Sequence, residues 1–536
     1  MIFSLKKNLR AIAFTLPMIV ALLAMPALAV PVLEPAKNDT LNLWVMDNGL
    51  GSQKAIRKIV KKFHRDGGAP VNVRVLEWGE AYATISRVLT NPDSVLDFPD
   101  VLQLGSTWVP HFASIGKLRT LQAPLAQVDS SRFYAEAFKA SHIPLDSNIY
   151  SFPWFLDIRA LFANEWLWHS LDIQDSDIIS YSRFIGALRA INQGELKNSE
   201  MKRVAAFALP GHNDWTGPQQ MAPFIWSLGG DYLNCKEGKC RSALFEQETI
   251  EGIALYAKIL GDEELAPHSL QENSEQNAIR FINSELLIHY GTSELIRQLE
   301  FPEEAGGLKN SAIADDGIMI ISAPASSFRS TFVGGSHLAL PVGGDSAKFK
   351  AAENLASYLL RTDNMDAFCR AVGFLPADRG LISIWNQDRR YMQLVKALEN
   401  GKSFPNIPEW GQIEGELIGF SNRMGSIFAT IEDKNERNNE LAKLLVEVHR
   451  KINAILGNTE PVDEAELRKI ALNAFNTEIQ EVMPENLQFE PVAPPIPSWR
   501  IALFVCVATG LVIIVAGLYL AIRFVKNRKK QGKILR

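Results

Sequence analysis

The sequence contains little cysteine and none of the short motifs that mark common hydrolytic sites. Only 4 cysteines occur in 536 residues. There is no G-x-S-x-G elbow and no H-E-x-x-H helix, which argues against the serine hydrolases and zinc peptidases that carry them. No segment repeats with a period of 20–50 residues, which argues against a solenoid or a propeller. The function must therefore come from other features of the chain.

The N-terminus has the pattern of a secretory signal peptide. Three basic residues, Lys6, Lys7 and Arg10, precede an apolar run at 11–25, which ends in the small-residue stretch Pro26-Ala27-Leu28-Ala29. A charged start, a short apolar segment and small residues at the cleavage site are typical of an exported precursor. We predict a signal peptide at 1–29.

The C-terminus has an apolar segment of a different kind. About 22 residues, 501–522, carry no charge, enough for a helix to cross the hydrocarbon core. The tail at 523–536 is basic without an acidic residue, which places it in the cytoplasm by the positive-inside rule. Prolines concentrate at 484–498, and we predict a stiff tether there. The folded body is thus expected outside the cytoplasm, attached by one transmembrane helix.

The charge of the body excludes some partners. The net charge is −5, and much of the basic excess lies in the predicted leader and tail, so the exported body is clearly acidic. This argues against nucleic acid or anionic lipid as its partner. The body is also too long for one hydrophobic core and suits two domains or lobes.

The cysteines predict one structural disulfide. Cys235 and Cys240 flank the turn-like stretch 236–239, and we expect them to pair in an oxidising exterior. The alternative is half of a zinc site, but no second Cys or His pair lies nearby. Cys369 lies in a helical pattern and is expected to be buried, and Cys506 lies in the predicted anchor. No metal is expected.

Strand and helix patterns alternate along the body, which predicts an α/β fold with a parallel sheet and right-handed crossovers. From 432 onward the pattern turns helical. The expected strands are 41–46, 71–76, 101–104, 159–164, 204–208, 318–322 and 337–340, and the expected helices are 53–65, 81–89, 217–227, 350–361, 441–456 and 464–482.

A partial glycine motif follows the first expected strand. Gly49 and Gly51 match the start of a dinucleotide-binding fingerprint, but Lys54 stands where the third glycine belongs. Nicotinamide cofactors are also not supplied outside the cytoplasm. We interpret the motif as a tight turn between strand and helix whose backbone amides face a cleft, and we expect no cofactor.

Several segments of the body carry motifs that belong together. They are PDVLQLGSTW at 99–108, FASIGKL at 112–118, YSFPWFLDIRALFAN at 150–164, WSLGGDY at 226–232, FVGGS at 332–336 and GFLPA at 373–377. In this order they resemble the extracellular solute-binding proteins that serve ABC importers, in the carbohydrate-binding group that includes the maltose- and glycerol-phosphate-binding proteins. The resemblance covers essentially the whole exported body.

The resemblance implies a two-lobed periplasmic-binding-protein fold, type II-like, that closes about a hinge on its ligand. Lobe one is expected at 41–153 plus 323–372, and lobe two at 154–322 plus 373–483. The C-terminal anchor departs from the family, whose exported members are usually free or lipid-modified at an N-terminal cysteine. The expected location is the bacterial inner membrane, single-pass, with the body in the periplasm or outside the cell.

Sugar sites combine aromatic platforms with planar polar groups, because sugars offer apolar C–H faces and many hydroxyls. The alternative to ligand binding is a structural role: a tryptophan can fill the core, and Asp157 and Arg159 can form a salt bridge that locks the hinge. The candidate ligand-binding residues are the aromatic Trp44, Trp78, Trp108, Trp154, Trp215 and Trp226, the polar Asn48, Glu77, Ser106, Asp157, Arg159, Asp214 and Ser336, and the glycines Gly229, Gly230, Gly334 and Gly335.

The expected function is a membrane-tethered receptor that binds a sugar or oligosaccharide for an ABC importer, with the permease subunits as partners. The alternative is a ligand-sensing subunit that reports to a membrane sensor protein. The chain is not expected to be an enzyme. A glycosidase needs two carboxylates that face one bond, and no segment assigns Glu77, Asp157 or Asp214 to that task.

Overall fold

The computed structural model describes residues 40–121, 129–485, 487–489 and 498–531, without the side chains of 390, 498–506 and 524–531. The predicted signal peptide, 1–29, lies outside these residues, as does most of the proline-rich segment 484–498. The chain divides after Thr40 into two compact units. Everything below concerns the second unit.

The first strands form the parallel α/β layer that the sequence predicts. β1 (Leu41–Met46) lies between β2 (Val71–Leu76) and β3 (Val101–Gly105) and is parallel to both, with Leu43 opposite Val73 and Val101. The crossovers include α2 (Ser52–Arg65) and α3 (Trp78–Thr90). β1 is almost wholly buried, as its apolar run requires of a central parallel strand.

Two long strands lie at the middle of the sheet, and one of them runs antiparallel to its neighbours on both sides. β10 (Thr331–Ala339) is antiparallel to both β3 and β4 (Ser151–Asn164). The far part of β4 continues against β8 (Leu286–Thr292) and β9 (Ile318–Ile321). The strand order is β2-β1-β3-β10-β4-β8-β5, so the expectation of a parallel sheet is wrong at its centre.

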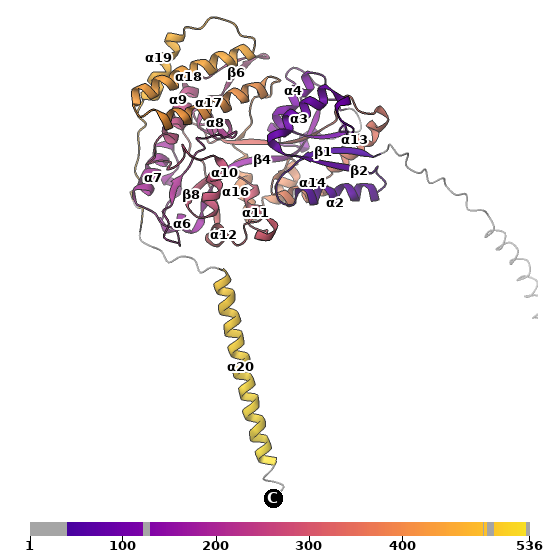
Figure 1. Cartoon of the computed structure of the whole chain (residues 1–536), viewed down its shortest axis with the longest axis vertical. Helices are drawn as coiled ribbons and strands as arrows, with labels where there is room; N and C mark the ends of the chain where they lie inside the picture. The colour runs from indigo at the N-terminus through magenta and orange to yellow at the C-terminus, as the bar shows by residue number, and fades with distance from the viewer. Residues whose placement is uncertain (1–39, 122–128, 486, 490–497, 532–536) are drawn as a thin grey trace, which may run out of the picture. The chain divides into compact units, whose positions relative to one another are not determined.

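Figure 1 shows the helices in two groups at opposite ends of this sheet. α8 (Gly217–Leu228), α9 (Gln247–Leu260), α17 (Trp410–Thr430), α18 (Lys434–Ile455) and α19 (Glu464–Asn476) gather at one end, and α2, α3, α13 (Phe349–Leu359) and α14 (Thr362–Val372) at the other. The remaining helices are α4 (Val109–Ser114), α5 (Ala135–Lys139), α6 (Glu165–Ser170), α7 (Tyr181–Gln193), α10 (Ser274–Ile282), α11 (Glu294–Gln298), α12 (Ala312–Asp316), α15 (Arg379–Trp385), α16 (Arg389–Leu398) and α20 (Ser498–Gln531). The short strands are β5 (Ala205–Phe207), β6 (Leu233–Lys236), β7 (Lys239–Ser242), β11 (Leu375–Pro376) and β12 (Gly401–Lys402).

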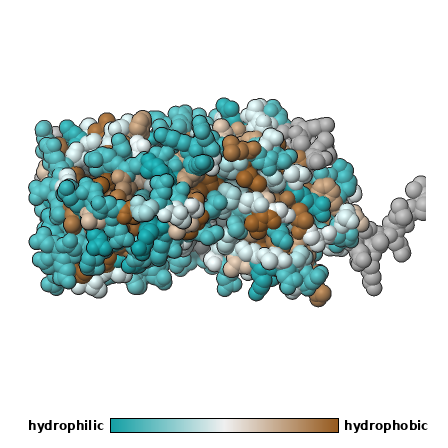
Figure 2. Space-filling view, turned by 90° about the horizontal axis from the view of Figure 1, so that it is seen from above, coloured by the Kyte–Doolittle hydropathy of each residue, from teal (hydrophilic) through white to brown (hydrophobic). Residues whose placement is uncertain are grey.

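The buried side chains form separate clusters toward the two ends of the sheet. We call the end with β1, α2, α13 and α14 the first half and the end with α7, α8, α9, α17 and α18 the second half. One cluster joins α7, α8, α9, α17 and α18, and another joins β1, α2, α13 and α14. Residues of α15 and α16, such as Trp385 and Leu394, pack in the second cluster with β1. The lobe boundaries given above stay predictions, although this packing differs from the predicted placement of 373–398 in lobe two. Figure 2 shows hydrophilic residues over most of one face, with apolar residues exposed in smaller groups.

The predictions for Cys235, Cys240 and Cys369 are confirmed, whereas the prediction for Cys506 falls on a side chain outside those described. A disulfide joins Cys235 in β6 to Cys240 in β7, and these two strands form a short antiparallel hairpin. Cys369 is free and buried in α14. The bond therefore closes a small loop at one edge of the second half.

Among the described residues, no helix is both long and apolar enough to span a membrane. The predicted span, 501–522, falls within α20 and extends past the side chains described there, 507–523.

The end of the folded body is a strap, residues 477–485 and 487–489, that lies along α7. It replaces the last part of the helix expected at 464–482. The Val482 N–H donates to the Ser182 carbonyl at 2.9 Å. Arg189 of α7 donates from Nε to one oxygen of Glu481 at 2.5 Å and from Nη2 to the other at 2.7 Å. Two glycines of this helix region make room for the strap, since a Cβ on Gly186 or Gly194 would overlap Val482 or Phe489.

We expect Gly186→Ala to lower the free energy of unfolding by about 1–3 kcal/mol, because overpacking displaces backbone. The new Cβ would lie 2.2 Å from the Val482 carbonyl oxygen. The matched control is Gly415→Ala in α17, where a Cβ meets nothing within 4 Å. That change should raise stability by about 0.5–1 kcal/mol, the usual gain of alanine over glycine in a helix. Urea denaturation measures both, and equal effects of the two variants would contradict the packing of the strap.

Candidate ligand-binding cleft

A cavity of about 450 Å³ lies between the two halves, beside the paired strands β4 and β10. Its walls come from the loops after β1 and β3 in the first half, and from α8, α11 and α17. The volume is within the range of about 300–1,000 Å³ that small-molecule sites occupy. It brings together ten of the predicted residues: Asn48, Trp78, Ser106, Trp108, Asp157, Arg159, Trp215, Gly334, Gly335 and Ser336.

The alternation of side chains along β4 decides which residues reach the cleft. Phe155, Asp157 and Arg159 line the cavity, while Trp154 and Leu156 point to the opposite face and are buried in the core. The ring of Trp154 stacks on Phe368 with 4.2 Å between centroids. The prediction that Trp154 binds ligand is therefore wrong, because the strand's period of two turns it into the core.

Trp44 and Trp226 are also core residues. Trp44 is buried in β1, and its Nε1–H donates to the Asp97 carbonyl at 3.1 Å. Trp226 is buried in α8, and its Nε1–H donates to Asp231 at 3.2 Å. Both rings thus have a core position and a protein partner for the polar atom, and neither lines the cleft.

The other predicted residues outside the cavity have local structural roles. Asp214 is buried and accepts hydrogen bonds from the backbone N–H groups of Thr216 (2.6 Å) and Ser274 (2.7 Å), so it fixes the loop before α8. Glu77 is exposed at the start of α3. Gly229 ends α8 with a φ of 98°, and Gly230 packs against Thr249.

A buried amide network forms the floor of the cleft. The Asn48 and Gln103 side-chain amides donate to each other, both at 3.1 Å. Gln103 also donates to the Ser336 hydroxyl at 2.8 Å and accepts from the Met46 N–H at 3.0 Å. This network ties β1, β3 and β10 together beneath the ligand space. Gln103 was not among the predicted site residues. A polar glutamine inside the otherwise apolar strand at 101–105 could have indicated a buried hydrogen-bonding role.

Asp157 and Arg159 present buried polar atoms to the cavity. Arg159 is only 7 % exposed, and neither its Nε nor the Asp157 Oδ1 has a hydrogen-bond partner among the described residues. The alternative of a hinge salt bridge is wrong, because no ion pair of the described residues joins Asp157 to Arg159. Burial raises the pKa of Asp157, an effect that Arg159 opposes. A buried donor and a buried acceptor are costly unless a ligand satisfies them.

Two glutamates in the cleft were not predicted. Glu294 of α11 accepts a hydrogen bond from Gln298 at 3.0 Å and lies so close to Gly49 that a Cβ there would be 2.0 Å from its oxygen. Burial, assisted by the charges of Asp157 and Asp47, raises the pKa of Glu294 to about 7. Burial also raises the pKa of Glu414, from α17, to about 7. No local sequence signal identifies these residues, because tertiary packing alone brings their helices to the cleft.

Aromatic rings line two sides of the cavity. In the first half, Trp78 and Trp108 meet edge to face with 5.5 Å between centroids. In the second half, Trp215 is 57 % exposed, and Phe332 packs against Phe404 at 4.7 Å. Flat apolar rings beside buried polar groups match what a sugar presents, an apolar ring face edged by hydroxyls.

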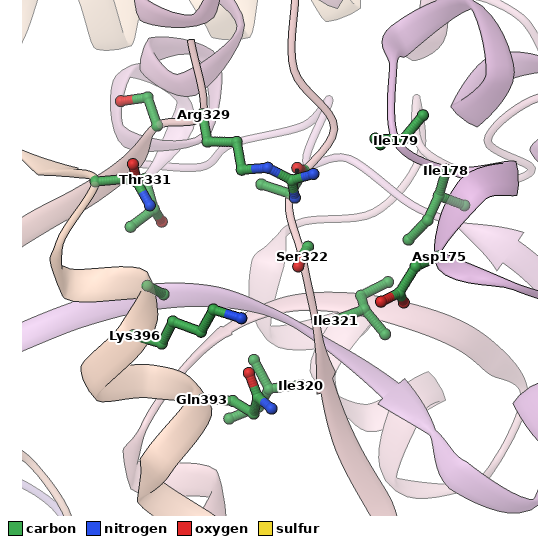
Figure 3. Close-up of a pocket in the computed structure, with 14 residues that line it drawn as sticks. Asp175, Ile178, Ile179, Ile320, Ile321, Ser322, Arg329, Thr331, Gln393 and Lys396 are labelled. Atoms are coloured by element: carbon green, nitrogen blue, oxygen red, sulfur yellow. Dashed lines mark hydrogen bonds between the residues drawn. The ribbon is translucent and has the colours of Figure 1, made fainter. Parts of the chain in front are cut away.

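Two further cavities lie near the hinge strands. One, of about 340 Å³, shares Ser106, Phe155 and Gly334 with the cleft and so extends it. The other, of about 390 Å³, is shown in Figure 3 and is lined by none of the predicted residues. Its wall contains Ile178, Ile320 and other apolar residues beside Arg329, whose guanidinium donates to the Ala323 carbonyl at 3.1 Å. The cleft between the halves is therefore the site that the predictions and the geometry share.

The chain belongs to the bacterial extracellular solute-binding proteins, because the family model of that description matches residues 58–383, more than half of the chain. It is similar to the diacetylchitobiose-binding protein DasA of Streptomyces coelicolor, with 24% identity over 380 residues that cover 70% of this chain and 82% of that protein. The resemblance stated from the sequence motifs is thus confirmed.

Solved structures with the same fold include sugar-binding members of ABC transporters. One is a solute-binding protein of Thermotoga lettingae bound with α-D-tagatose, with a TM-score of 0.63, 16% identity, and coverage of 78% of this chain and 100% of that one. Another is the GacH receptor of Streptomyces glaucescens, solved unliganded and with acarbose, with a TM-score of 0.62, 16% identity, and coverage of 78% and 99%. At these identities the likeness shows the two-lobed α/β fold.

The raised pKa of Glu294 predicts a pH-dependent effect of Glu294→Gln. The folded-state pKa lies above the ordinary value of 4.5, so the folded chain binds the extra proton and wild-type stability falls as the pH rises from about 4.5 to about 7. Glutamine carries no charge, so the variant should be more stable than wild type by about 1–3 kcal/mol at pH 8 and equal to it near pH 4.

Thermal unfolding at several pH values measures this difference. Glu80→Gln is the matched control, because Glu80 is exposed on α3 and does not line the cleft. Its stability should follow that of wild type at every pH. A gain in Glu294→Gln that is the same at pH 4 and pH 8 would contradict the burial of this carboxyl.

Proposed function

We propose that this protein is an extracytoplasmic receptor that binds a sugar or oligosaccharide in the cleft between its halves. The observation that carries the proposal is the pair of buried polar atoms on Asp157 and Arg159 that have no hydrogen-bond partner in the described part of the chain, with Trp78, Trp108 and Trp215 around them. The acceptor and the donor suit sugar hydroxyls, and the rings suit the C–H faces. The sugar-binding relatives support the same ligand class.

In this proposal the ligand closes the two halves about a hinge. β4 crosses between the halves, since it pairs with β10 and β11 in its first part and with β8 and β9 in its second part. A sugar that contacts Trp108 on one side and Trp215 on the other favours the closed form, because a ligand shifts a two-state equilibrium by its difference in affinity.

The closed form is proposed to present its sugar to the permease of an ABC importer. The family supports this partner, since its members serve such transporters. The protein would then carry out no chemistry of its own, as a pure binding protein. A sensing role would use the same cleft and would differ only in the membrane partner.

We also propose, from the sequence, that residues 501–522 anchor the protein in the inner membrane. Alkaline carbonate washing of membranes from cells that express the full chain tests this proposal. The wild type should stay in the membrane pellet, and a variant with Leu511 and Val515 both changed to arginine should be released, because charge at the centre of a span is costly. Release of both proteins alike would contradict the anchor.

A thermal-shift panel of sugars, polyols, sugar phosphates and amino acids tests the binding function. A bound solute at a hundred times its dissociation constant should stabilise the protein by ~2.7 kcal/mol. Trp215→Ala should abolish that shift with little loss of stability, because the side chain is mostly exposed. Trp154→Ala should instead lower stability by about 3–5 kcal/mol, because the ring is in the core.

The two tryptophan variants serve as controls for each other, since both remove an indole close to the hinge. A sugar-dependent shift that survives in Trp215→Ala would contradict the placement of the ligand. No shift with any sugar would contradict the proposed function itself.

A further inference from the structure

We propose that the sugar bound in the cleft carries an ammonium group, which makes the ligand class an amino sugar. This inference rests on the proposed function and narrows it. It comes from the balance of charges and of hydrogen-bonding atoms in the cleft.

Carboxyl groups outnumber cations in the cavity wall. Among the described residues that line it, the acidic ones are Asp47, Asp157, Glu294 and Glu414, and Arg159 is the single Lys or Arg. The first three lie close enough together that the charges of Asp47 and Asp157 act on Glu294. A neutral sugar would leave this repulsion in place, whereas a cation would relieve it.

The unpartnered buried atoms independently indicate a ligand rich in donors. Gln219 of α8 is 8 % exposed and lines the cavity, and its Oε1 has no hydrogen-bond partner among the described residues. The Asp157 Oδ1 is a second buried acceptor without a hydrogen-bond partner among the described residues. An ammonium group is a strong donor with three N–H bonds and no acceptor, whereas a hydroxyl supplies only one donor.

Two of the other carboxyls, Asp47 and Glu294, already have protein partners. Asp47 accepts from the Gly49 N–H and the Ser52 hydroxyl, both at 3.1 Å, and Glu294 accepts from Gln298. Because its buried Oδ1 has no hydrogen-bond partner among the described residues, Asp157 is the carboxylate that we assign to direct contact with the ammonium. Asp47 and the ionised fraction of Glu294 add negative potential around it. Arg159 remains available to a ring or hydroxyl oxygen.

The aromatic walls favour a ring over an open chain. Trp78 and Trp108 on one side and Trp215 on the other offer faces for the C–H groups of a pyranose. The electron-rich face of an indole also attracts a nearby cation. A linear polyamine would satisfy the carboxylates but would leave much of this apolar surface in contact with water.

The test is calorimetric titration of the purified full-length chain with matched sugars that differ at one position. The series is glucose, N-acetylglucosamine and glucosamine, with the corresponding β-1,4 disaccharides cellobiose, diacetylchitobiose and chitobiose, at pH 7. Spermidine is the open-chain cation. We expect the free amine to bind at least tenfold more tightly than the matched hydroxyl and acetamide sugars, and more tightly than spermidine.

Variants then assign the effect to the proposed groups. Asp157→Asn should reduce the preference for the amine over the hydroxyl sugar to near onefold, because the amide lacks the negative charge that the ammonium contacts. Glu294→Gln should reduce the preference partially, and Glu80→Gln, outside the cleft, should leave it unchanged. Since Asp157 has an unpartnered oxygen and no ion pair, its amide variant is expected to fold, and its melting temperature checks this.

Each outcome has one meaning. Equal binding of the three sugars, or tighter binding of the acetamide, overturns the ammonium inference and leaves the sugar-binding function standing. A preference for the amine that persists in Asp157→Asn overturns the assignment of the contact. Binding of spermidine without any sugar overturns both the amino-sugar inference and the proposed function.

Discussion

The antiparallel pairing of β4 with β10 is the constraint on which the rest of the structure depends. Both strands run through the centre of the sheet, and β4 joins the first half of the fold to the second. The backbones approach so closely at Gly335 that a Cβ there would lie 2.5 Å from the Phe155 carbonyl oxygen. This close pairing lets one strand present core residues on one face and cleft residues on the other.

The cleft is built from groups that are costly in the absence of a ligand. Arg159 and Gln219 are buried, and each has a polar atom without a partner among the residues that the structure describes. Burial keeps the pKa values of Glu294 and Glu414 near 7. The Asn48–Gln103–Ser336 network beneath them is, by contrast, internally hydrogen-bonded. The floor is therefore preorganised, whereas the walls hold groups whose hydrogen bonds a ligand would complete.

Much of the fold was predictable from local patterns, because β1, β2, α2 and α8 follow their hydrophobic periodicity closely. The antiparallel centre was not, since strand direction depends on a pairing between residues far apart in sequence. Trp154 and Phe155 show the same limit within the site. The motif at 150–164 led to Trp154 as the predicted cleft residue, but the alternation of side chains along β4 turns Phe155 to the cavity instead.

Three cleft residues, Glu294, Glu414 and Gln219, could not be predicted from the sequence. Each lies on a helix whose own pattern carries no sign of binding, and only tertiary packing brings the three helices to one cavity. Asn48, Trp78, Ser106 and Trp108 were predictable because they follow strand ends, where the loops of an α/β fold meet a crevice.

The central claim is that the cleft between the halves binds a carbohydrate. A crystal structure of the protein grown with the tightest sugar from the binding panel tests it most directly. The predicted result is a sugar ring between Trp108 and Trp215, with hydrogen bonds to the Asp157 carboxylate and the Arg159 guanidinium. Sugar bound instead in the isoleucine-lined cavity of Figure 3, or at any surface away from β4 and β10, would contradict it.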